Sequence, residues 1–529
     1  MAEPTPNDYT SLVPHYTFAD NLVEQEAQLA VNPLLARLHA ARRALASDLH
    51  RPVYHYVNPE STLNDPNGLC FWQGRWHLFY QAYPPEDPRQ HWGHAVSDDL
   101  IHWRDLPYAI YPNPEECVFS GSALVEDDRV IAIYHGTKHG NIVALSSDPL
   151  LLNWEKLTGQ AVIPIDSADG SDLPYRIHDP CIWQKDGVYY ALSNGRDWWR
   201  PLDYLFRSEN LIDWEYLHPF IEGDRFTLPG DDGACPYFWP IGDRHILLFF
   251  SHLSGGQAFL GDYDTERDKF VVTSHHDFNF GAYGPGGVHA PSATPDGEGG
   301  VVVIFNMNPA KPTEGWDQIM TLPRRLTLLG PDTLGVEPAG AVESLRGAHQ
   351  QVRGMTLPAN QEVVLDGIAG NALEILAEID TAGASSVELN VLRAPGREEY
   401  TRIVFFRERG FWEWESYADE GASGRKAARE SLVSIDTSYS STLPDVRARA
   451  PETGPVYLAP DEPLRLRVFV DKSVVEVFVN GRQCLAVRVY PGRSDSTGVS
   501  LRAQGQDAHL RSLDAWQMEN IYQTKGTEL

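Results

Sequence analysis

Three acidic stretches stand at the start of aromatic, β-branched segments and contain the residues best suited to chemistry. They are Asn64-Asp65-Pro66-Asn67-Gly68, His178-Asp179-Pro180 and Asp231-Asp232-Gly233-Ala234-Cys235-Pro236. Two carboxyl groups that face one polar, aromatic-lined pocket can cleave a glycosidic bond. An ionised one attacks or stabilises the anomeric carbon, and one with a raised pKa protonates the leaving oxygen. The alternative is that Asp-Pro and Asp-Gly are ordinary turn residues.

These stretches can form one pocket only if the strands that follow them converge. Pro180 and Pro236 are each followed by a tryptophan at the third position, Trp183 and Trp239, so two of the segments share a register. In a β-propeller the strands nearest the axis begin close together, so residues at the heads of the blades face one funnel.

The segment that carries these motifs is typical of such a propeller. From Tyr54 onward, short runs of Val, Ile, Tyr, Phe and Trp are bounded by Gly, Asp, Asn and Pro, without the alternating helices of a doubly wound sheet. Similar stretches ending at Trp103, Trp154 and Trp214 recur at intervals of roughly 50–60 residues, a period typical of propeller blades. We therefore expect an all-β protein with a five-bladed β-propeller over residues 50–335. A β-sandwich with coincidental tryptophan spacing is the alternative.

The two flanks differ from this segment. Residues 1–49 predict a helical extension, two short helices separated at Pro33, that packs on the main body; a partner-binding arm is the alternative. Residues 336–529 begin with a Gly/Pro-rich linker and continue with longer strands that alternate more cleanly. Such alternation is typical of a two-sheet β-sandwich.

Composition excludes several classes of function. The net charge of −30 opposes binding to nucleic acids and to anionic membranes. No apolar run is long enough to span a membrane, and the N-terminus lacks the pattern of a secretory signal. The five cysteines have no CxxC spacing, which favours buried thiols over a disulfide framework or a zinc site. We expect a cytoplasmic protein without a metal or cofactor.

Four motifs between His55 and Ala123 resemble a known family. HYVNPESTLNDPNG, FYQAYP, HWGHAVSDDLIHW and FSGSA occur there in this order. They are similar to the opening motifs of glycoside hydrolase family 32, the family of invertases, fructanases and fructosyltransferases. Weaker similarities extend the resemblance over residues 52–520. The resemblance implies a five-bladed propeller followed by a β-sandwich, in agreement with the strand pattern.

The resemblance also implies roles for single residues. Asp65 matches the family's nucleophile, which would form a fructosyl-enzyme ester in a retaining reaction. Asp179 matches the aspartate that holds two fructose hydroxyls and stabilises the transition state. Residues that match sugar-contacting or sugar-lining positions are Asn64, Gln81, Trp92, Phe119 and Ser120.

Two departures from the family pattern bear on catalysis. The family has arginine before the second aspartate, where this chain has His178; Arg176 could reach the same place. The family's acid/base glutamate precedes Cys-Pro, where this chain has Ala234.

Three explanations of Ala234 stay open. Asp232 or Asp231 supplies the proton from a rearranged strand start, with Gly233 permitting a kink and Asp232 the first choice. The chain is an engineered acid-to-alanine variant. Or the protein binds fructans or has altered chemistry.

The function we expect is hydrolysis of terminal β-D-fructofuranosyl units from sucrose, fructo-oligosaccharides or fructans. The alternatives are fructosyl transfer through the same intermediate, and a catalytically impaired fructan-binding protein. The expected partner is a small sugar, and the C-terminal sandwich is a candidate surface for a homo-oligomer.

Overall fold

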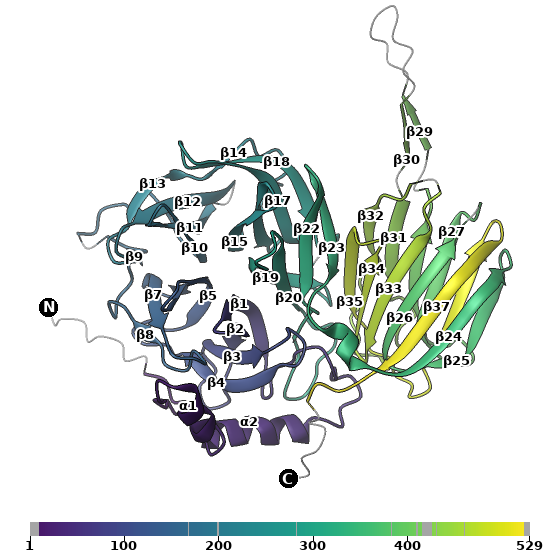
Figure 1. Cartoon of the computed structure of the whole chain (residues 1–529), viewed down its shortest axis with the longest axis horizontal. Coiled ribbons are helices and arrows are strands. Elements are labelled where there is room, and N and C mark those ends of the chain that lie inside the picture. The colour runs from purple at the N-terminus through teal and green to yellow at the C-terminus, as the bar shows by residue number, and fades with distance from the viewer. Residues whose placement is uncertain are drawn as a thin grey trace, which may run out of the picture.

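The protein is a β-propeller beside a β-sandwich. The computed structural model describes residues 10–522, apart from residues 168, 198–199, 282, 382, 409–410, 415–425, 430 and 460. Figure 1 shows the blades arranged around a central axis, with the two sheets of the sandwich to one side. The fold class expected from the sequence is therefore confirmed. In the described part of the chain, no helix combines the length and apolar character that crossing a bilayer requires.

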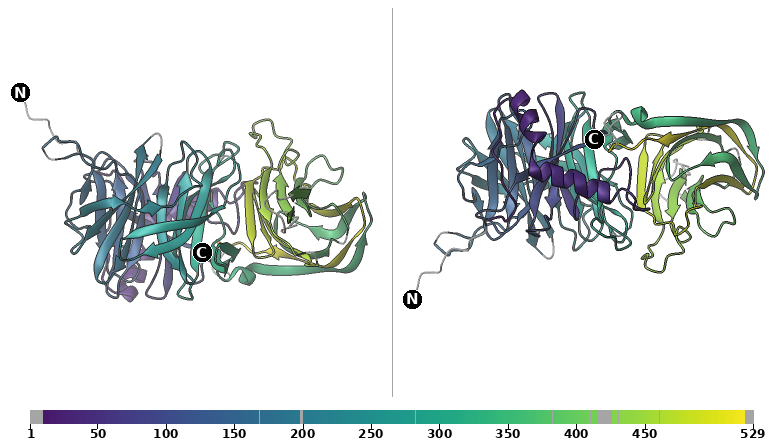
Figure 2. Two further views of the ribbon diagram at one scale, coloured as in Figure 1. Left: turned by 90° about the horizontal axis from the view of Figure 1, so that it is seen from above. Right: turned by 90° about the horizontal axis from the view of Figure 1, so that it is seen from below.

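The N-terminal extension forms two short helices, as the sequence predicted. They are α1 (Leu22–Leu29) and α2 (Pro33–Ala44), and they lie along the outside of the propeller near β4 (Figures 1 and 2). Asn21 and Asn32 cap them: each side chain accepts a hydrogen bond at 3.0 Å from the backbone N–H three residues on. Pro33 is the first residue of α2, where its missing N–H has no partner to lose.

The first three blades are antiparallel sheets in chain order. Blade 1 comprises β1 (Leu63–Trp72), β2 (Arg75–Ala82), β3 (His91–Ser97) and β4 (Arg104–Ile110). Blade 2 comprises β5 (Val118–Val125), β6 (Val130–Gly136), β7 (Gly140–Ser146) and β8 (Glu155–Lys156), with β9 (Ile163–Pro164) also paired to β7. Blade 3 comprises β10 (Pro180–Lys185), β11 (Val188–Asp197), β12 (Arg200–Ser208) and β13 (Glu215–Pro219).

The last two blades complete the ring. Blade 4 comprises β15 (Ala234–Ile241), β16 (Arg244–Ser251), β17 (Gly255–Asp264) and β18 (Lys269–Asp277), with β14 (Ile221–Glu222) parallel to β18. Blade 5 comprises β19 (Val288–Pro295), β20 (Val301–Met307), β22 (Arg324–Gly330) and β23 (Thr333–Pro338), with β21 (Ile319–Met320) beside β20. The innermost strands β1, β5, β10, β15 and β19 contact one another in a closed circle.

The C-terminal sandwich consists of two six-stranded sheets with an apolar core between them. The short 3₁₀-helix η1 (Val342–Leu345) precedes it. One sheet comprises β24 (Arg346–Leu357), β37 (Ala508–Met518), β26 (Ala372–Asp380), β33 (Leu464–Asp471), β34 (Val474–Val479) and β35 (Gln483–Arg488). The other comprises β25 (Glu362–Ala369), β36 (Gly498–Gln504), β27 (Ser386–Arg393), β28 (Thr401–Phe406), β31 (Ser431–Asp436) and β32 (Glu452–Val456). The hairpin of β29 (Phe411–Trp414) and β30 (Lys426–Arg429) projects from the sandwich (Figure 1).

A buried ionic network joins the sandwich to the propeller. Asp471, at the end of β33, accepts hydrogen bonds from the backbone N–H groups of Val53, Tyr54 and His55 at 2.8–2.9 Å and from Nδ1 of His55 at 2.9 Å. Nε2 of His55 lies 3.0 Å from Glu476 on β34. Burial alone would lower the pKa of His55, but its hydrogen bonds to Asp471 and Glu476 and the charges of both carboxylates raise that pKa to about 8.

This network should make the stability of the protein depend on Asp471 and on pH. Asn at position 471 keeps one acceptor oxygen and loses the charge, so we expect Asp471→Asn to lower the free energy of unfolding by about 2–4 kcal/mol. The folded pKa of His55 lies above its ordinary 6.5, so its stabilising contribution is complete below about pH 6.5 and is lost as the pH rises through about 8. Thermal unfolding between pH 6 and 9 measures both effects. Asp99→Asn, at an exposed His–Asp pair, is the control, and an unchanged Tm for Asp471→Asn at pH 6.5 would contradict the prediction.

Candidate active site

The innermost strand of every blade brings one polar side chain to the axis of the propeller. These residues are Asp65 on β1, Ser120 on β5, Asp179 directly before β10, Cys235 on β15 and His289 on β19. In β1, β5, β15 and β19 the pairing with the next strand is interrupted by a register shift that spans the site residue. Such a bulge turns a side chain out of the regular alternation, so here it directs polar groups toward the axis.

Asp65 makes its side-chain hydrogen bonds through one carboxylate oxygen. Its Oδ2 accepts hydrogen bonds from the Ser120 hydroxyl at 2.7 Å and from Nε2 of Gln81 at 3.3 Å. Its Oδ1 lies 3.1 Å from Nδ1 of His289 without hydrogen-bond alignment, and has no hydrogen-bond partner in the described residues. The side chain is buried, so its Oδ2 is fixed by hydrogen bonds, whereas the equally buried Oδ1 makes none to the described residues.

Asp179 lies across the axis beside two histidines. Its Oδ1 accepts a hydrogen bond from Nδ1 of His178 at 2.9 Å, and its Oδ2 accepts one from the backbone N–H of Cys235 at 3.0 Å. The rings of His178 and His135 stack with their centroids 4.4 Å apart. Burial would raise the pKa of Asp179, but the charge and hydrogen bond of His178, the charge of His135 and the Cys235 N–H lower it. The carboxyl group is therefore ionised.

Cys235 stands between the two carboxylates. Its Sγ lies 3.6 Å from Oδ2 of Asp65 and 3.5 Å from Oδ2 of Asp179. Burial, followed by the negative charges of both aspartates, raises the pKa of the thiol well above its ordinary value, so sulfur stays neutral and can donate a weak hydrogen bond. Cys235 has a φ of 52°, a strained conformation for a non-glycine residue that aims both its N–H and its thiol at the site.

The residues predicted to contact sugar divide into two groups. Asn64 and Gln81 belong to the site, because Nδ2 of Asn64 donates to Oε1 of Gln81 at 3.0 Å and Gln81 in turn donates to Asp65 and to Ser120. Phe119 is partly exposed, and its ring lies 6.0 Å from that of His178.

Trp92 and Arg176 lie elsewhere than expected. Trp92 has no exposed surface, so it does not line the sugar site. Its indole N–H donates a hydrogen bond to the backbone carbonyl of Phe119 at 2.9 Å. Arg176 is exposed, and no hydrogen bond or ion pair of its side chain reaches any residue that the structure describes. His178 alone therefore contacts Asp179 from the position where an arginine was expected.

The two aspartates proposed as proton donors have different partners. Asp231 is buried and accepts hydrogen bonds from the Ser251 and Ser254 hydroxyls and the Leu228 N–H, so it is held by its own loop and by the turn between β16 and β17. Asp232 accepts from the backbone N–H of His252 at 2.8 Å and from Nδ1 of the same residue at 2.7 Å.

Gly233 does not have the positive φ that a left-handed kink would need; that conformation falls on Cys235 instead. Glycine is required here for space. A Cβ at position 233 would lie 3.3 Å from both Nδ2 of Asn194 and Oδ1 of Asp203.

Comparison with known proteins decides the family. The model of the Glycosyl hydrolases family 32 N-terminal domain matches residues 55–338, and that of the Glycosyl hydrolases family 32 C terminal matches residues 341–517. The chain belongs to glycosyl hydrolase family 32. Its membership confirms the family and the glycosidase class expected from the sequence.

Curated family 32 relatives cover most of the chain at low identity. A levanase of Bacillus subtilis (strain 168) is 27% identical over 92% of this chain and 73% of the relative. A sucrose-6-phosphate hydrolase of Escherichia coli is 27% identical over 91% of this chain and 99% of the relative. The crystal structure of fructan 1-exohydrolase IIa from Cichorium intybus superimposes with a TM-score of 0.76 at 22% identity, over 89% of this chain and 98% of that one. This superposition shows the shared fold.

Two residues of this region have no functional signal in the sequence: Cys235, which lies between the two carboxyl groups, and Asp203. His289 could be suspected, because it opens an innermost strand as Asp65 does. In the described residues, no group of three or more His, Cys, Asp and Glu side chains has the arrangement of a metal site.

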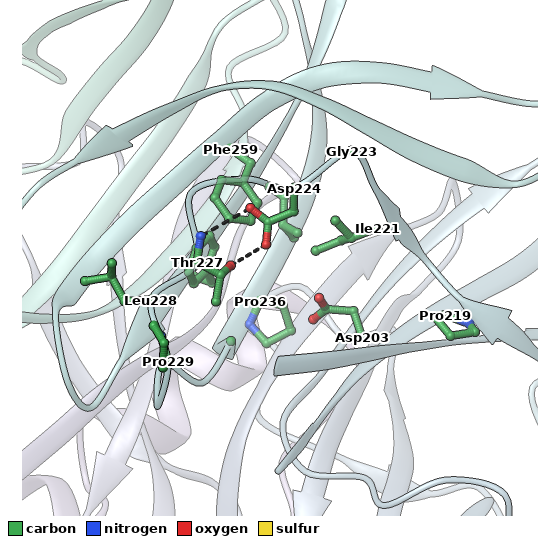
Figure 3. Close-up of a pocket in the computed structure, with 13 residues that line it drawn as sticks. Asp203, Pro219, Ile221, Gly223, Asp224, Thr227, Leu228, Pro229, Pro236 and Phe259 are labelled. Carbon is green, nitrogen blue, oxygen red and sulfur yellow. Dashed lines mark hydrogen bonds between the residues drawn. The ribbon is translucent and has the colours of Figure 1, made fainter. Parts of the chain in front are cut away.

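A cavity of about 480 Å³ opens between blades 3 and 4, next to the Ala234-Cys235 pair. Figure 3 shows its apolar wall, with the Asp203 carboxyl group beside Pro236 and Asp224 bonded to Thr227. Within the described structure, no hydrogen bond or ion pair reaches the carboxyl group of Asp203, although it is only 6% exposed. Burial, reinforced by the negative charge of Asp224, raises the pKa of Asp203 to about 7.

The unpartnered carboxyl should destabilise the protein at alkaline pH. Its folded pKa lies above the ordinary 3.8, so its favourable contribution is complete below about pH 3.8 and is lost as the pH rises through about 7. Asn cannot ionise, so we expect Asp203→Asn to be more stable than wild type by about 2–4 kcal/mol at pH 8 and to lose this advantage by pH 4. Thermal unfolding across this range measures the difference.

Asp224→Asn is the matched control for that prediction. Asp224 lines the same cavity and its charge adds to the raised pKa of Asp203, but it also accepts hydrogen bonds from the Phe226 and Thr227 N–H groups and the Thr227 hydroxyl, so Asp224→Asn should stabilise the protein at pH 8 less than Asp203→Asn does. An Asp203→Asn variant that is no more stable than wild type at pH 8 would show that ionisation of this buried carboxyl group does not destabilise the protein.

Proposed function

We propose that the protein is a retaining β-fructofuranosidase, which releases terminal β-D-fructofuranosyl units from sucrose, fructo-oligosaccharides or fructans. The observation that carries the proposal is the pair of buried carboxylates at the axis: Asp65 has one free oxygen, and Asp179 is ionised beside it. Both carboxylates stand at the positions that the family 32 motifs predict.

The relatives support this class of substrate. Named relatives include a levanase, a sucrose-6-phosphate hydrolase, a raffinose invertase and a fructan 1-exohydrolase. A solved variant of the Cichorium intybus exohydrolase holds 1-kestose, and one of the Bombyx mori β-fructofuranosidase holds sucrose. These ligands share a terminal fructofuranosyl unit, so such a unit is what we assign to the axial pocket.

The mechanism we propose follows from the contacts of the two aspartates. Ser120 and Gln81 fix Oδ2 of Asp65, which leaves Oδ1 to attack the anomeric C2 and form a fructosyl-enzyme ester. The Asp179 carboxylate accepts hydrogen bonds from sugar hydroxyls and stabilises the positive charge that develops at the ring. Asp232 and its hydrogen-bonded partner His252 supply the proton for the leaving oxygen.

A substrate panel tests the proposed reaction. We expect free fructose from sucrose, inulin or levan, and sucrose 6-phosphate extends the panel because it is the substrate named for a relative. In methanol–water mixtures a retaining enzyme yields methyl β-D-fructofuranoside, which NMR distinguishes from the α anomer. Longer fructans as the main product would indicate a transferase. Sugar binding without turnover would indicate a binding protein, and the α-methyl glycoside would exclude the ester.

Asp65→Asn tests the nucleophile. The amide is close in shape to the carboxylate but cannot form the ester, so we expect turnover to fall by at least about 10⁴-fold. Calorimetric titration with the best substrate should show retained binding, and Tm should change little. Asp99→Asn, at the surface of blade 1, is the control and keeps full activity. An Asp65→Asn variant with more than a few per cent of wild-type turnover would remove Asp65 from this role.

A further inference from the structure

We propose that His252 is the general acid/base of this enzyme, replacing the carboxyl group that is absent at Ala234, and that Asp232 is its positioning residue. The inference rests on the proposed function, since it names the group that protonates the leaving oxygen of the same reaction.

The register of β15 and β16 places the imidazole where a donor is needed. Ala234 pairs with Phe250 across the two antiparallel strands. One step further along the same face, Asp232 comes opposite His252, because residues two apart in a strand share a face. The hydrogen bonds between Asp232 and His252 confirm this continuation of the pairing. The imidazole therefore lies on the same face of the sheet as the Cβ of Ala234.

The contacts of Asp232 make it the partner rather than the donor. Both of its oxygens contact His252, one at the backbone N–H and one at Nδ1, so the carboxyl group is engaged by this residue through both of its oxygens. A buried carboxylate on Nδ1 fixes the tautomer and orientation of the ring and stabilises the imidazolium, as in other acid/base dyads. The side chain of Asp232 is 12% exposed and that of His252 is 47% exposed, so of the two side chains the imidazole is the one that reaches solvent.

Ring contacts connect His252 to His289, which lies beside Asp65. The centroid of the His252 ring is 4.9 Å from Phe250, 6.1 Å from His289 and 6.3 Å from Tyr283. His289 in turn reaches to 3.1 Å from Oδ1 of Asp65, the oxygen proposed to attack. The titratable groups that face His252 are therefore Asp232 from the loop before β15, Tyr283 from the loop before β19, and His289 from β19.

His252 gives up a proton as the fructosyl ester forms and regains one as the ester is hydrolysed. Oδ1 of Asp65 bonds to C2 as the C2–O bond to the leaving sugar breaks, and the leaving oxygen takes the proton from Nε2 of the His252 imidazolium. Water then attacks C2 and gives its proton to the neutral imidazole, while the C2–O bond to Asp65 breaks. Fructose leaves, and the Asp65 carboxylate and the imidazolium are restored.

The chain contains a matched control pair outside the site. His102 and Asp99, between β3 and β4, have the same two contacts: the backbone N–H of His102 donates to Oδ1 at 2.8 Å and its Nδ1 to Oδ2 at 2.7 Å. The His102 side chain is 48% exposed, nearly the same as that of His252. His102→Gln removes the same imidazole contact as His252→Gln and leaves the backbone one, without touching the propeller axis.

The decisive experiment compares two leaving groups in His252→Gln. Sucrose needs a proton on its leaving oxygen, so we expect kcat/KM for sucrose to fall by about 10²–10⁴-fold. 4-Nitrophenyl β-D-fructofuranoside needs little protonation, so its kcat/KM should fall less than about tenfold. In this variant water has no general base to activate its attack on the fructosyl ester. Azide is an anion that attacks without a base, so added azide should raise kcat and yield fructosyl azide. His102→Gln should match wild type on both substrates and show no azide effect.

Asp232→Asn and a rescue variant separate the two members of the pair. If Asp232 acts through His252, Asp232→Asn loses less sucrose activity than His252→Gln, and the double variant loses no more than His252→Gln alone. Ala234→Glu in the His252→Gln background should restore part of the sucrose activity, because it returns a donor to the same face.

Four results would overturn the inference. His252→Gln within threefold of wild type on sucrose, with Asp232→Asn severely impaired, would make Asp232 the donor. Equal loss on both substrates, without azide rescue, would make His252 structural. A wild-type protein that cleaves neither substrate would refute the proposed function and the inference with it, whereas a wild type that cleaves both while His252→Gln is unaffected would refute the inference alone.

Discussion

The site depends on holding two buried carboxyl groups, Asp65 and Asp179, close together in a place with little water. Asp65 and Asp179 both lie within 3.6 Å of the Cys235 sulfur, and both are buried. Like charges in such surroundings repel strongly unless donors compensate them. The propeller meets this requirement because each innermost strand delivers one group to the axis, and the bulges at the strand heads turn these groups inward.

The sandwich takes part in the same arrangement. Arg488 on β35 donates to the carbonyl of Asp317, and the neighbouring Gln318 donates to Oδ1 of Asn64. Asn64 donates to Gln81, which contacts the nucleophile. A continuous chain of hydrogen bonds thus runs from the second domain to Asp65, while Asp471 anchors the segment that leads into β1. The C-terminal domain fixes the position of the first blade, and through it the position of the reactive oxygen.

Loss of a carboxyl group at position 234 changes the chemistry of the chamber without changing its frame. Ala234 packs with Phe250, Cys235, Ala290 and Tyr283 in a small apolar cluster, so the β15–β16 pair keeps its register. The polar contacts next to this cluster are those between Asp232 and His252, two residues away from Ala234 and Phe250. On the far side of the strand, Gly233 leaves room for Asn194 and for the unpartnered Asp203. The blade-head geometry therefore accommodates alanine at position 234, with Asp232 and His252 in contact at the neighbouring positions of the same two segments.

The sequence by itself determined the blades, the sandwich and the two helices. It also determined the place of Asp65 and Asp179, because alternation, turn residues and Asp-Pro pairs act over a few neighbouring residues. The positions of single side chains were predicted less well from the sequence where they depend on contacts with other blades. Trp92 stands at a motif position expected to line the sugar site, but it is buried. Gly233 leaves space for neighbouring side chains and does not form the expected kink. Asp232 is hydrogen-bonded to His252. Only the tertiary structure brought Cys235, His289 and His252 to the axis. Their contacts cross between strands and blades far apart in the chain, and a local pattern does not encode the direction that a bulge gives to a side chain.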